Sequence, residues 1–292
     1  MAALRIREFT DPACPFAFSA EPVRWRLRWL YGDQIEWELR MIVLSRSPDE
    51  YLAKGFTPER QAAALADLQH RYGMPIDPRP RPRMIATIHA CRAVVATRIH
   101  CPQHERRLLR ELRRRAMRGQ LIDDPGVIAR AARAAGMDPF AIFRWWEDDP
   151  AVEGALRADM NAARAPSPET LALRHKLAAT DDGNHRYTCP TYEIERLDGG
   201  GRIDVPGFHP AEAYEVAIAN LAPELERRPV ASSVREVLAW AGEPLATAEV
   251  AAICDLSHEE ARTELARVAD ENAVGADGWW TERRVTHQLA AA

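Results

Sequence analysis

The sequence predicts an α/β fold in which a small β-sheet is interrupted by a long helical insertion. Two segments, 3–9 and 34–44, alternate apolar and polar residues as half-buried strands do, and the amphipathic run 16–31 between them has a helical period. From residue 48 to about 180 the period is helical, and prolines divide this insertion into four to six predicted helices. The chain therefore opens as a βαβ unit followed by helices.

Strand periodicity returns after the insertion. Residues 187–197 and 202–205 flank the turn sequence Asp198–Gly201, which predicts a hairpin, and residues 210–227 predict a closing helix. The segment 163–185 contains prolines, charges and a glycine turn, and we expect it to be a loop that joins the insertion to the hairpin. The predicted order is βαβ, helical insertion, ββα.

The C-terminal residues predict a second, smaller domain. We expect one domain at 1–228 and another at 230–292, with the polar, proline-containing segment 226–229 between them. The second domain has three predicted helices, followed by a short β segment around Trp279 and Trp280. The predicted helices span 232–241, 246–254 and 258–272. This order outlines a winged helix.

Charge and hydropathy limit the partners to be expected. The 292 residues carry a net charge of −4, and the second predicted domain holds eleven acidic residues against five arginines. Such a surface repels phosphates, so we expect no nucleic-acid partner. The sequence has no apolar run of about 18 residues, and its first residues lack an apolar signal region, so we expect a cytoplasmic protein without a membrane partner. A homodimer through the C-terminal unit is left open.

One helical run is unusually rich in arginine. Residues 106–115 place leucines on one stripe of a helix and arginines around the rest. We interpret the arginines as a solvated face, although the run also fits an approach path for an anionic thiol.

The chemistry of the sequence centres on Cys14. The five cysteines form no CxxC pair and are odd in number, so we expect neither a structural disulfide framework nor a metal site. Cys14 precedes Pro15 at the first turn of a predicted helix, where free backbone N–H groups and the helix dipole stabilise a thiolate. The pattern therefore predicts a nucleophilic thiol at position 14.

Three motifs together resemble the DsbA family over roughly residues 3–225. They are Asp11-Pro12-Ala13-Cys14-Pro15-Phe16 after the first strand, Thr188-Cys189-Pro190-Thr191-Tyr192 at the third strand, and Val205-Pro206-Gly207-Phe208-His209-Pro210 before the last helix. Within that family the pattern is similar to the cytoplasmic branch typified by FrnE, kappa-class glutathione transferases and hydroxychromene-carboxylate isomerases. The resemblance implies a thioredoxin fold with a large helical insertion.

The resemblance also implies a site. Pro190 takes the place of the cis-proline that faces the active-site turn, and Pro15, Phe16 and Thr188 take places that line the thiol-binding surface. Ala17 stands where redox members have the second cysteine of Cys-Pro-x-Cys, and Ala86 stands where many relatives have an asparagine near the thiol cofactor. Cys189, or else Cys91 on the helix above the turn, would then have to resolve a mixed disulfide on Cys14.

Three functions are consistent with these residues. The first is a cytosolic thiol-disulfide oxidoreductase that acts through Cys14, with Cys189 or an external low-molecular-weight thiol resolving the adduct, on a small thiol or a protein thiol. The second is a transferase or isomerase of the kappa-class type that uses such a thiol as co-substrate. The third is a binding protein that retains the fold without catalysis. In each case we expect no bound cofactor.

Overall fold

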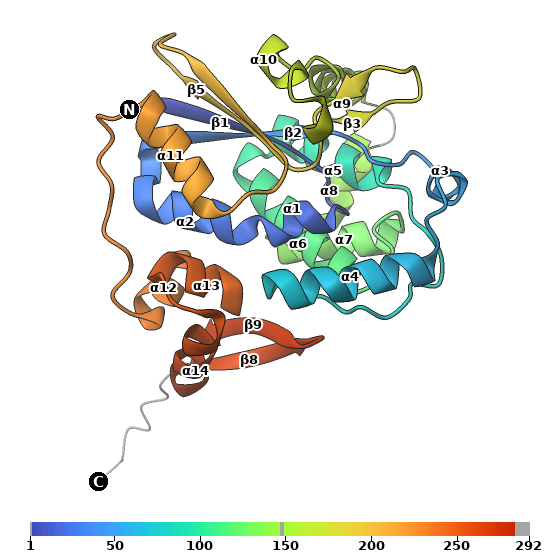
Figure 1. Ribbon diagram of the computed structural model, residues 1–292. Helices are drawn as coiled ribbons and strands as arrows, with labels where there is room; N and C mark the ends of the chain where they lie inside the picture. The colour runs from blue at the N-terminus through green and yellow to red at the C-terminus, as the bar shows by residue number, and fades with distance from the viewer. Residues whose placement is uncertain (1, 147–148, 284–292) are drawn as a thin grey trace.

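A four-stranded sheet lies at the centre of the larger part of the chain in the computed structural model, which describes residues 2–146 and 149–283 (Figure 1). The strand order is β2-β1-β5-β6, with β1 parallel to β2 and antiparallel to β5, and β5 antiparallel to β6. The elements of this part are β1 (Leu4–Thr10), α1 (Pro15–Ser19), α2 (Glu21–Tyr31), β2 (Ile35–Met41), β5 (Thr191–Arg196), β6 (Arg202–Pro206) and α11 (Ala211–Leu221). The predicted mixed α/β fold is confirmed.

The first helical run is broken into two helices. The sequence predicted one helix over 16–31, but α1 ends at Ser19 and α2 begins at Glu21, with Ala20 as the junction. Pro22 explains the break, because a proline ring clashes with the carbonyl group four residues earlier and has no N–H to donate. The short helix α1 therefore carries Cys14 separately from the longer α2.

The insertion contains eight α-helices in the described residues, more than the four to six predicted. They are α3 (Pro48–Ala53), α4 (Pro58–Tyr72), α5 (Ile88–His100), α6 (Glu105–Met117), α7 (Pro125–Ala134), α8 (Pro139–Trp146), α9 (Pro150–Ala163) and α10 (Pro168–Leu171). Most begin at a proline, which suits the first helical position because its missing N–H has no partner there. The predicted loop at 163–185 is partly ordered, with α10 and the paired strands β3 (Ala178–Ala179) and β4 (His185–Arg186).

The C-terminal unit combines helices with a small sheet. Its elements are α12 (Val234–Ala241), β7 (Leu245–Ala246), α13 (Thr247–Cys254), α14 (His258–Val268), β8 (Ala269–Val274) and β9 (Asp277–Glu282). The sheet order is β7-β9-β8. The third helix is shorter than predicted, because residues 269–274 pair with β9 instead of continuing α14. Residues 284–292 of the predicted second domain lie outside the described residues.

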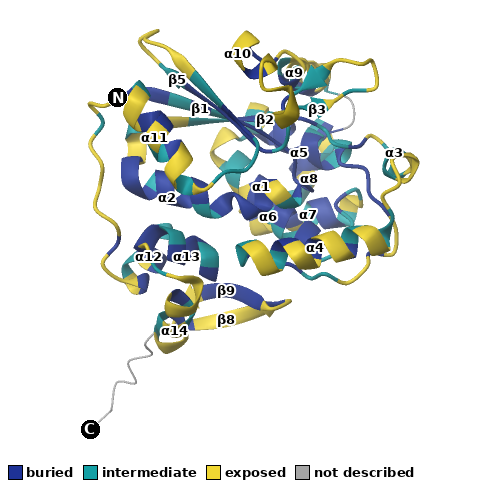
Figure 2. Cartoon of the chain, in the orientation of Figure 1, coloured by how far each residue is buried: buried dark blue, intermediate teal, exposed yellow. Residues whose placement is uncertain are grey.

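The C-terminal unit shares its apolar core with the rest of the chain. Trp280 lies in one cluster with residues of β1, α2 and α11, and Trp279 lies in another with residues of the insertion. The Trp279 ring meets Phe18 of α1 edge-to-face, with 6.1 Å between ring centroids. Figure 2 shows β9 and much of α2 as buried, whereas β8 is largely exposed. The C-terminal unit therefore packs against α1, the short helix that follows Cys14.

Two arginines of α6 are buried, which corrects the interpretation of the arginine-rich run as a solvated face. Arg110 donates to both carboxylate oxygens of Glu249 on α13, at 2.6 and 2.8 Å. Arg113 donates to Glu8 of β1 at 2.7 Å and also contacts Glu21 of α2. Burial opposes ionisation of Glu21, but the charges of Arg113 and Arg110 lower the pKa of Glu21 to about 2. These carboxylates come from distant segments, so the pattern of one helix could not reveal them.

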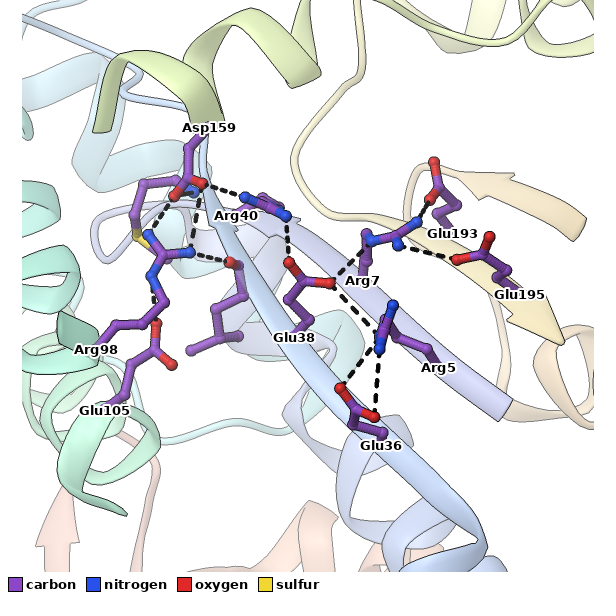
Figure 3. Close-up of polar contacts among 12 residues, drawn as sticks. Arg5, Arg7, Glu36, Glu38, Arg40, Arg98, Glu105, Asp159, Glu193 and Glu195 are labelled. Carbon is purple, nitrogen blue, oxygen red and sulfur yellow. Dashed lines mark hydrogen bonds and ion pairs between the residues drawn. The ribbon is translucent and has the colours of Figure 1, made fainter. Parts of the chain in front are cut away.

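A row of paired charged side chains, the charged ladder, lies on the face of β1 and β2 that is opposite to α2 and α11. Arg5 of β1 pairs with Glu36 of β2 at 3.1 Å, and Arg40 pairs with Asp159 of α9 at 2.9 Å. Figure 3 shows that Glu38 lies between these pairs and links them through its own contacts. Leu4, Ile6 and Ile35 of the sheet pack in one apolar cluster with residues of α2 and α11, whereas Leu39 and Met41 of β2 pack with the insertion.

Candidate functional site

Cys14 lies at the point where the chain leaves β1 and enters α1. It is the N-cap residue of α1, and Pro15 is the first helical residue, as the sequence predicted. The Cys14 N–H donates to the Asp11 carbonyl at 3.2 Å, which closes the turn after β1. Cys14 is only 4% exposed, whereas the neighbouring Phe16 is 46% exposed. The Cys14 thiol is therefore buried, and an exposed aromatic side chain lies next to it in the chain.

Cys189 and Pro190 face this turn from the start of β5. The Cys189–Pro190 peptide bond is cis, and the Pro190 carbonyl accepts from the Gly207 N–H at 3.0 Å. The Cys14 Sγ lies 3.4 Å from the Cys189 carbonyl oxygen, to which the thiol donates. Thr188 is partly exposed beside them, and its carbonyl accepts from Thr191 at 2.8 Å. The fold thus brings Cys14, Cys189 and Pro190 together across 175 residues of sequence.

The surroundings of Cys14 favour its thiolate. A hydrogen bond from the Cys189 thiol makes the largest contribution, and the backbone N–H groups of Ala17 and Phe16 add to it. Together they hold the pKa of Cys14 below its ordinary value, although burial and the charge of Asp11 act in the opposite direction. Burial, and then the hydrogen bond and charge of Cys14, raise the pKa of Cys189 well above its ordinary value. The two shifts have opposite directions, so ionisation is favoured at Cys14 and disfavoured at Cys189.

Asp11 is a buried residue of the site whose contacts the sequence did not predict. Its Oδ1 accepts from the Ala13 N–H at 2.7 Å, and its Oδ2 accepts from the Leu44 N–H at 2.9 Å. The Cys91 thiol of α5 also donates to Oδ2, at 3.4 Å. The side chain is fully buried, so the carboxylate connects the cysteine turn to the segment that follows β2 and to the insertion. The only sequence signal was its place in the Asp-Pro-Ala-Cys-Pro motif.

Cys91 has the opposite electrostatic surroundings from Cys14. It is fully buried on α5, and burial together with the charge and hydrogen bond of Asp11 raises its pKa well above the ordinary value. Ala86, where relatives have an asparagine, is buried just before α5, and its N–H donates to Asp123 at 3.1 Å. The structure therefore brings Cys91 to Asp11 and places it in no hydrogen bond with Cys14. Within residues 2–146 and 149–283, no group of three or more side chains is arranged to hold a metal ion.

A cavity of about 470 Å³ opens beside the cysteine turn, lined by Pro15, Phe16 and residues of α3 and α4. Tyr51 of α3 lies in the wall of this cavity. Burial raises the pKa of Tyr51, and the charges of Asp11 and the three site cysteines raise it further. The exposed Phe56 packs edge-to-face on Tyr51 at 5.9 Å, and Lys54 adds a positive charge to the wall. No sequence pattern distinguished Tyr51 or Phe56, because their role depends on how the insertion folds back over Cys14.

These features define a class of protein: a thioredoxin-type fold in which a cysteine at the start of the first helix faces a cis-proline. The sequence matches the family model of the DSBA-like thioredoxin domain over residues 5–166, which is more than half of the chain. The chain therefore belongs to the DSBA-like thioredoxin family of thiol-disulfide oxidoreductases.

Solved structures show the same fold at low sequence identity. A probable DsbA oxidoreductase from Streptomyces coelicolor is 18% identical with a TM-score of 0.56, and the match covers 78% of this chain and 93% of that one. The cytosolic disulfide reductase DsbM from Pseudomonas aeruginosa is 15% identical with a TM-score of 0.51, over 75% of this chain and 100% of that one. No curated protein matches the sequence. Among the helices that the structure describes, none is long and apolar enough to cross a membrane.

Proposed function

We propose that this protein is a thiol-disulfide oxidoreductase in which Cys14 is the nucleophile and Cys189 the resolving thiol. The observation that carries the proposal is the pairing of the two residues: the Cys14 Sγ lies 3.4 Å from the Cys189 carbonyl oxygen, and the side chain of Cys189 makes the largest contribution to lowering the pKa of Cys14. Ala17 has no thiol, so a partner for Cys14 has to come from outside α1, and Cys189 is the cysteine in contact with it.

The reaction takes two exchange steps. The Cys14 thiolate attacks one sulfur of a substrate disulfide, forms a mixed disulfide with it, and releases the other substrate sulfur as a thiolate. Cys189 then attacks the Cys14 sulfur, forms a Cys14–Cys189 disulfide, and releases the second substrate thiolate, which takes up a proton. The substrate gains two electrons and the cysteine pair loses two, and the reverse sequence oxidises a substrate dithiol.

The pKa of Cys189 depends on the state of Cys14. Part of its rise comes from the hydrogen bond and charge of the Cys14 thiolate, and both are lost when Cys14 enters a mixed disulfide. Cys189 therefore ionises more readily at the stage when its attack is needed. Cys189 is also partly exposed, so an external low-molecular-weight thiol has a route to the same adduct and is the second resolving agent we propose.

Mass spectrometry after exposure to bis(2-hydroxyethyl) disulfide tests the proposal. We expect a Cys14–Cys189 disulfide in the wild type, and a stable Cys14 adduct of 2-mercaptoethanol in Cys189→Ser. Cys254→Ser is the matched control and should behave as the wild type, because Cys254 lies in the C-terminal unit. Failure of Cys14 to form either product in any variant would overturn the proposal, and a Cys14–Cys91 disulfide in Cys189→Ser would reassign the resolving role.

A single-thiol transferase or isomerase is the second candidate. It is favoured by the cavity of about 470 Å³ beside Phe16, whose wall carries Lys54 and Arg60 and so suits an anionic thiol co-substrate. Such an enzyme needs Cys14 and does not need Cys189. Full turnover by Cys189→Ala with an added thiol, together with absence of the internal disulfide in the wild type, would favour this function.

We also propose a location and a role for the C-terminal unit. All five cysteines are unpaired, which suits the reducing cytoplasm, and fractionation of the native host tests this. We interpret the C-terminal unit as a winged-helix-like module that does not bind nucleic acid, because Glu259 and Glu260 are exposed on the first turn of α14. Its packing against α1 supports a role in holding the thiol site, and a gel-shift assay with duplex DNA tests the absence of binding.

A further inference from the structure

A cavity of about 440 Å³, the linker cavity, lies between the end of α2, the linker 226–229 and α12. Among the residues that the structure describes, its lining shares none with the cavity beside Cys14. Trp240 of α12 adds a partly exposed aromatic ring to the wall. The charged residues of the lining are Arg28, Glu226, Arg227 and Arg228. The linker cavity therefore combines an excess of positive charge with an aromatic surface.

Hydrogen bonds hold the linker against the end of α2. The side-chain amide of Gln34 donates to the Glu226 carbonyl at 2.7 Å and accepts from the Glu226 N–H at 3.0 Å. The Arg228 N–H donates to the Leu30 carbonyl at 2.8 Å. The Arg228 guanidinium lies over the ring of Trp29, 3.5 Å from its centroid. The segment that joins α11 to α12 in Figure 1 is thus fixed at both ends, and the linker cavity is preformed.

Arg28 is the arginine of the linker cavity that lacks a counter-charge. The other two arginines of the lining are paired, Arg227 with Glu215 at 2.6 Å and Arg228 with Glu236 at 2.9 Å. Within the described part of the chain, no carboxylate forms an ion pair with Arg28, and its buried Nη1 has no hydrogen-bond acceptor. A guanidinium group without these partners costs free energy, so the fold alone does not explain this residue.

The surroundings of Arg28 oppose its positive charge. Its guanidinium carbon lies over the rings of Trp25 and Trp240, at 4.7 and 5.7 Å from their centroids. Burial, followed by the charges of Arg106 and Arg24, lowers the pKa of Arg28 to about 10, and nearby glutamates offset this only in part. Arg28 is still charged at neutral pH. Because that charge is shared over the whole guanidinium group, an anion in the linker cavity supplies the missing counter-charge.

We propose that the linker cavity binds a small organic anion that carries an aromatic ring. The carboxylate or phosphate of the ligand pairs with Arg28, and its ring packs on the exposed part of Trp240. The volume of the cavity lies in the range of about 300–1,000 Å³ that is typical of small-molecule sites. The site goes beyond the proposed function, because it does not involve Cys14. Its walls come from α2 and from α12, so a bound ligand also stabilises the attachment of the C-terminal unit.

Isothermal titration calorimetry with four probes tests both halves of the ligand. 2-Naphthoate and 2-naphthyl phosphate carry a ring and a charge, 2-naphthylmethanol carries only the ring, and acetate carries only the charge. At least one naphthalene anion should bind about tenfold or more tightly than 2-naphthylmethanol and acetate, as a charge-assisted hydrogen bond predicts. The comparison of the two naphthalene anions shows whether carboxylate or phosphate is preferred. Equal affinity for the anion and 2-naphthylmethanol, or binding of neither naphthalene anion, would overturn the proposal.

A matched pair of variants assigns the binding to the linker cavity. Arg28→Gln should weaken the naphthalene anion about tenfold or more and leave 2-naphthylmethanol unchanged. Arg107→Gln removes an exposed arginine of α6 outside the lining, so it has the same change in net charge and should bind as the wild type. Urea unfolding should show that Arg28→Gln stays folded, since it loses an unpaired charge.

Equal affinities in the two variants would mean that the anion binds elsewhere, and the proposed site would fail. Cys14→Ser should bind the probes as the wild type does, because the linker cavity and the cysteine turn are lined by different residues. If disulfides do not react at Cys14 but Arg28 controls anion binding, the proposed function fails and the site in the linker cavity stands.

Discussion

Cys14 and Cys91 lie in one buried cluster around Asp11, yet the pKa values of their thiols are shifted in opposite directions. Cys14 is 4% exposed and Cys91 is fully buried, so burial disfavours both thiolates. Cys14 accepts hydrogen bonds from Cys189 and from backbone N–H groups, which lower its pKa. Cys91 instead donates to the Asp11 carboxylate, which raises its pKa. The partner of each sulfur decides its reactivity, because desolvation acts on both.

The largest expected effect is the difference in reactivity between these two thiols. With iodoacetamide at pH 7, Cys14 should react at least about 100-fold faster than Cys91, because the thiolate is the nucleophile and Cys91 remains a buried thiol. Quenched time points followed by peptide mass spectrometry measure both rates in one sample. Unfolding in guanidinium chloride should make the two rates similar, which is the control. Comparable rates in the folded protein would mean that the hydrogen-bond partners do not set reactivity.

The next prediction concerns the loss of the Cys189 thiol, the hydrogen-bond donor that favours ionisation of Cys14. Cys189→Ala should slow alkylation of Cys14 at pH 7 by about tenfold, because a hydrogen bond to a charged group contributes roughly 1.5–3 kcal/mol. Cys189→Ser keeps a hydroxyl donor at the same place and should stay close to the wild-type rate. The measurement is the alkylation rate across pH 5 to 10. If the alanine and serine variants are slowed equally, the thiol of Cys189 is not acting as a donor.

The two thiols also show how much of the site could be predicted from the sequence. The place of Cys14 followed from a local rule, since a cysteine before proline at a helix start is adjacent in sequence to the N–H groups that act on it. The proximity of Cys189 followed from family motifs that record the fold. The environment of Cys91 did not follow from either, because Asp11 contacts it across 80 residues of sequence. Arg110 was misread for the same reason, since its partner Glu249 lies 139 residues away.

The high pKa of Cys91 predicts a pH dependence of stability. An unfolded cysteine ionises near its ordinary value of 9.0, whereas Cys91 in the folded state keeps its proton to higher pH. Above pH 9 the folded state therefore binds more protons than the unfolded state at this position, and stability falls as pH rises. The wild type should lose about 1.4 kcal/mol per pH unit more than Cys91→Ala in this range.

Urea unfolding at pH 8, 9, 10 and 10.5 measures this slope. Cys91→Ala should be less stable than the wild type at pH 8, because it leaves a small cavity in α5, and the difference should narrow as the pH rises. Val94→Ala, which makes a cavity on the same helix without removing a titratable group, is the control and should keep a constant difference from the wild type. A constant difference for Cys91→Ala would show that burial and Asp11 do not raise the pKa of Cys91.

The smallest expected effect comes from Asp11 itself, where the two thiols should respond in the same direction. The negative charge of Asp11 raises the pKa of both Cys14 and Cys91, so Asp11→Asn should speed alkylation of Cys14 at pH 7 by about twofold to fivefold. The substitution also turns an amide donor toward N–H groups that need an acceptor, at a cost of about 1–3 kcal/mol in the free energy of unfolding. Asp33→Asn, exposed in the short turn after α2, is the control for both measurements. A slower Cys14 in a folded Asp11→Asn protein would mean that Asp11 acts mainly by shaping the turn, and that its charge is secondary to the position it gives to the sulfur.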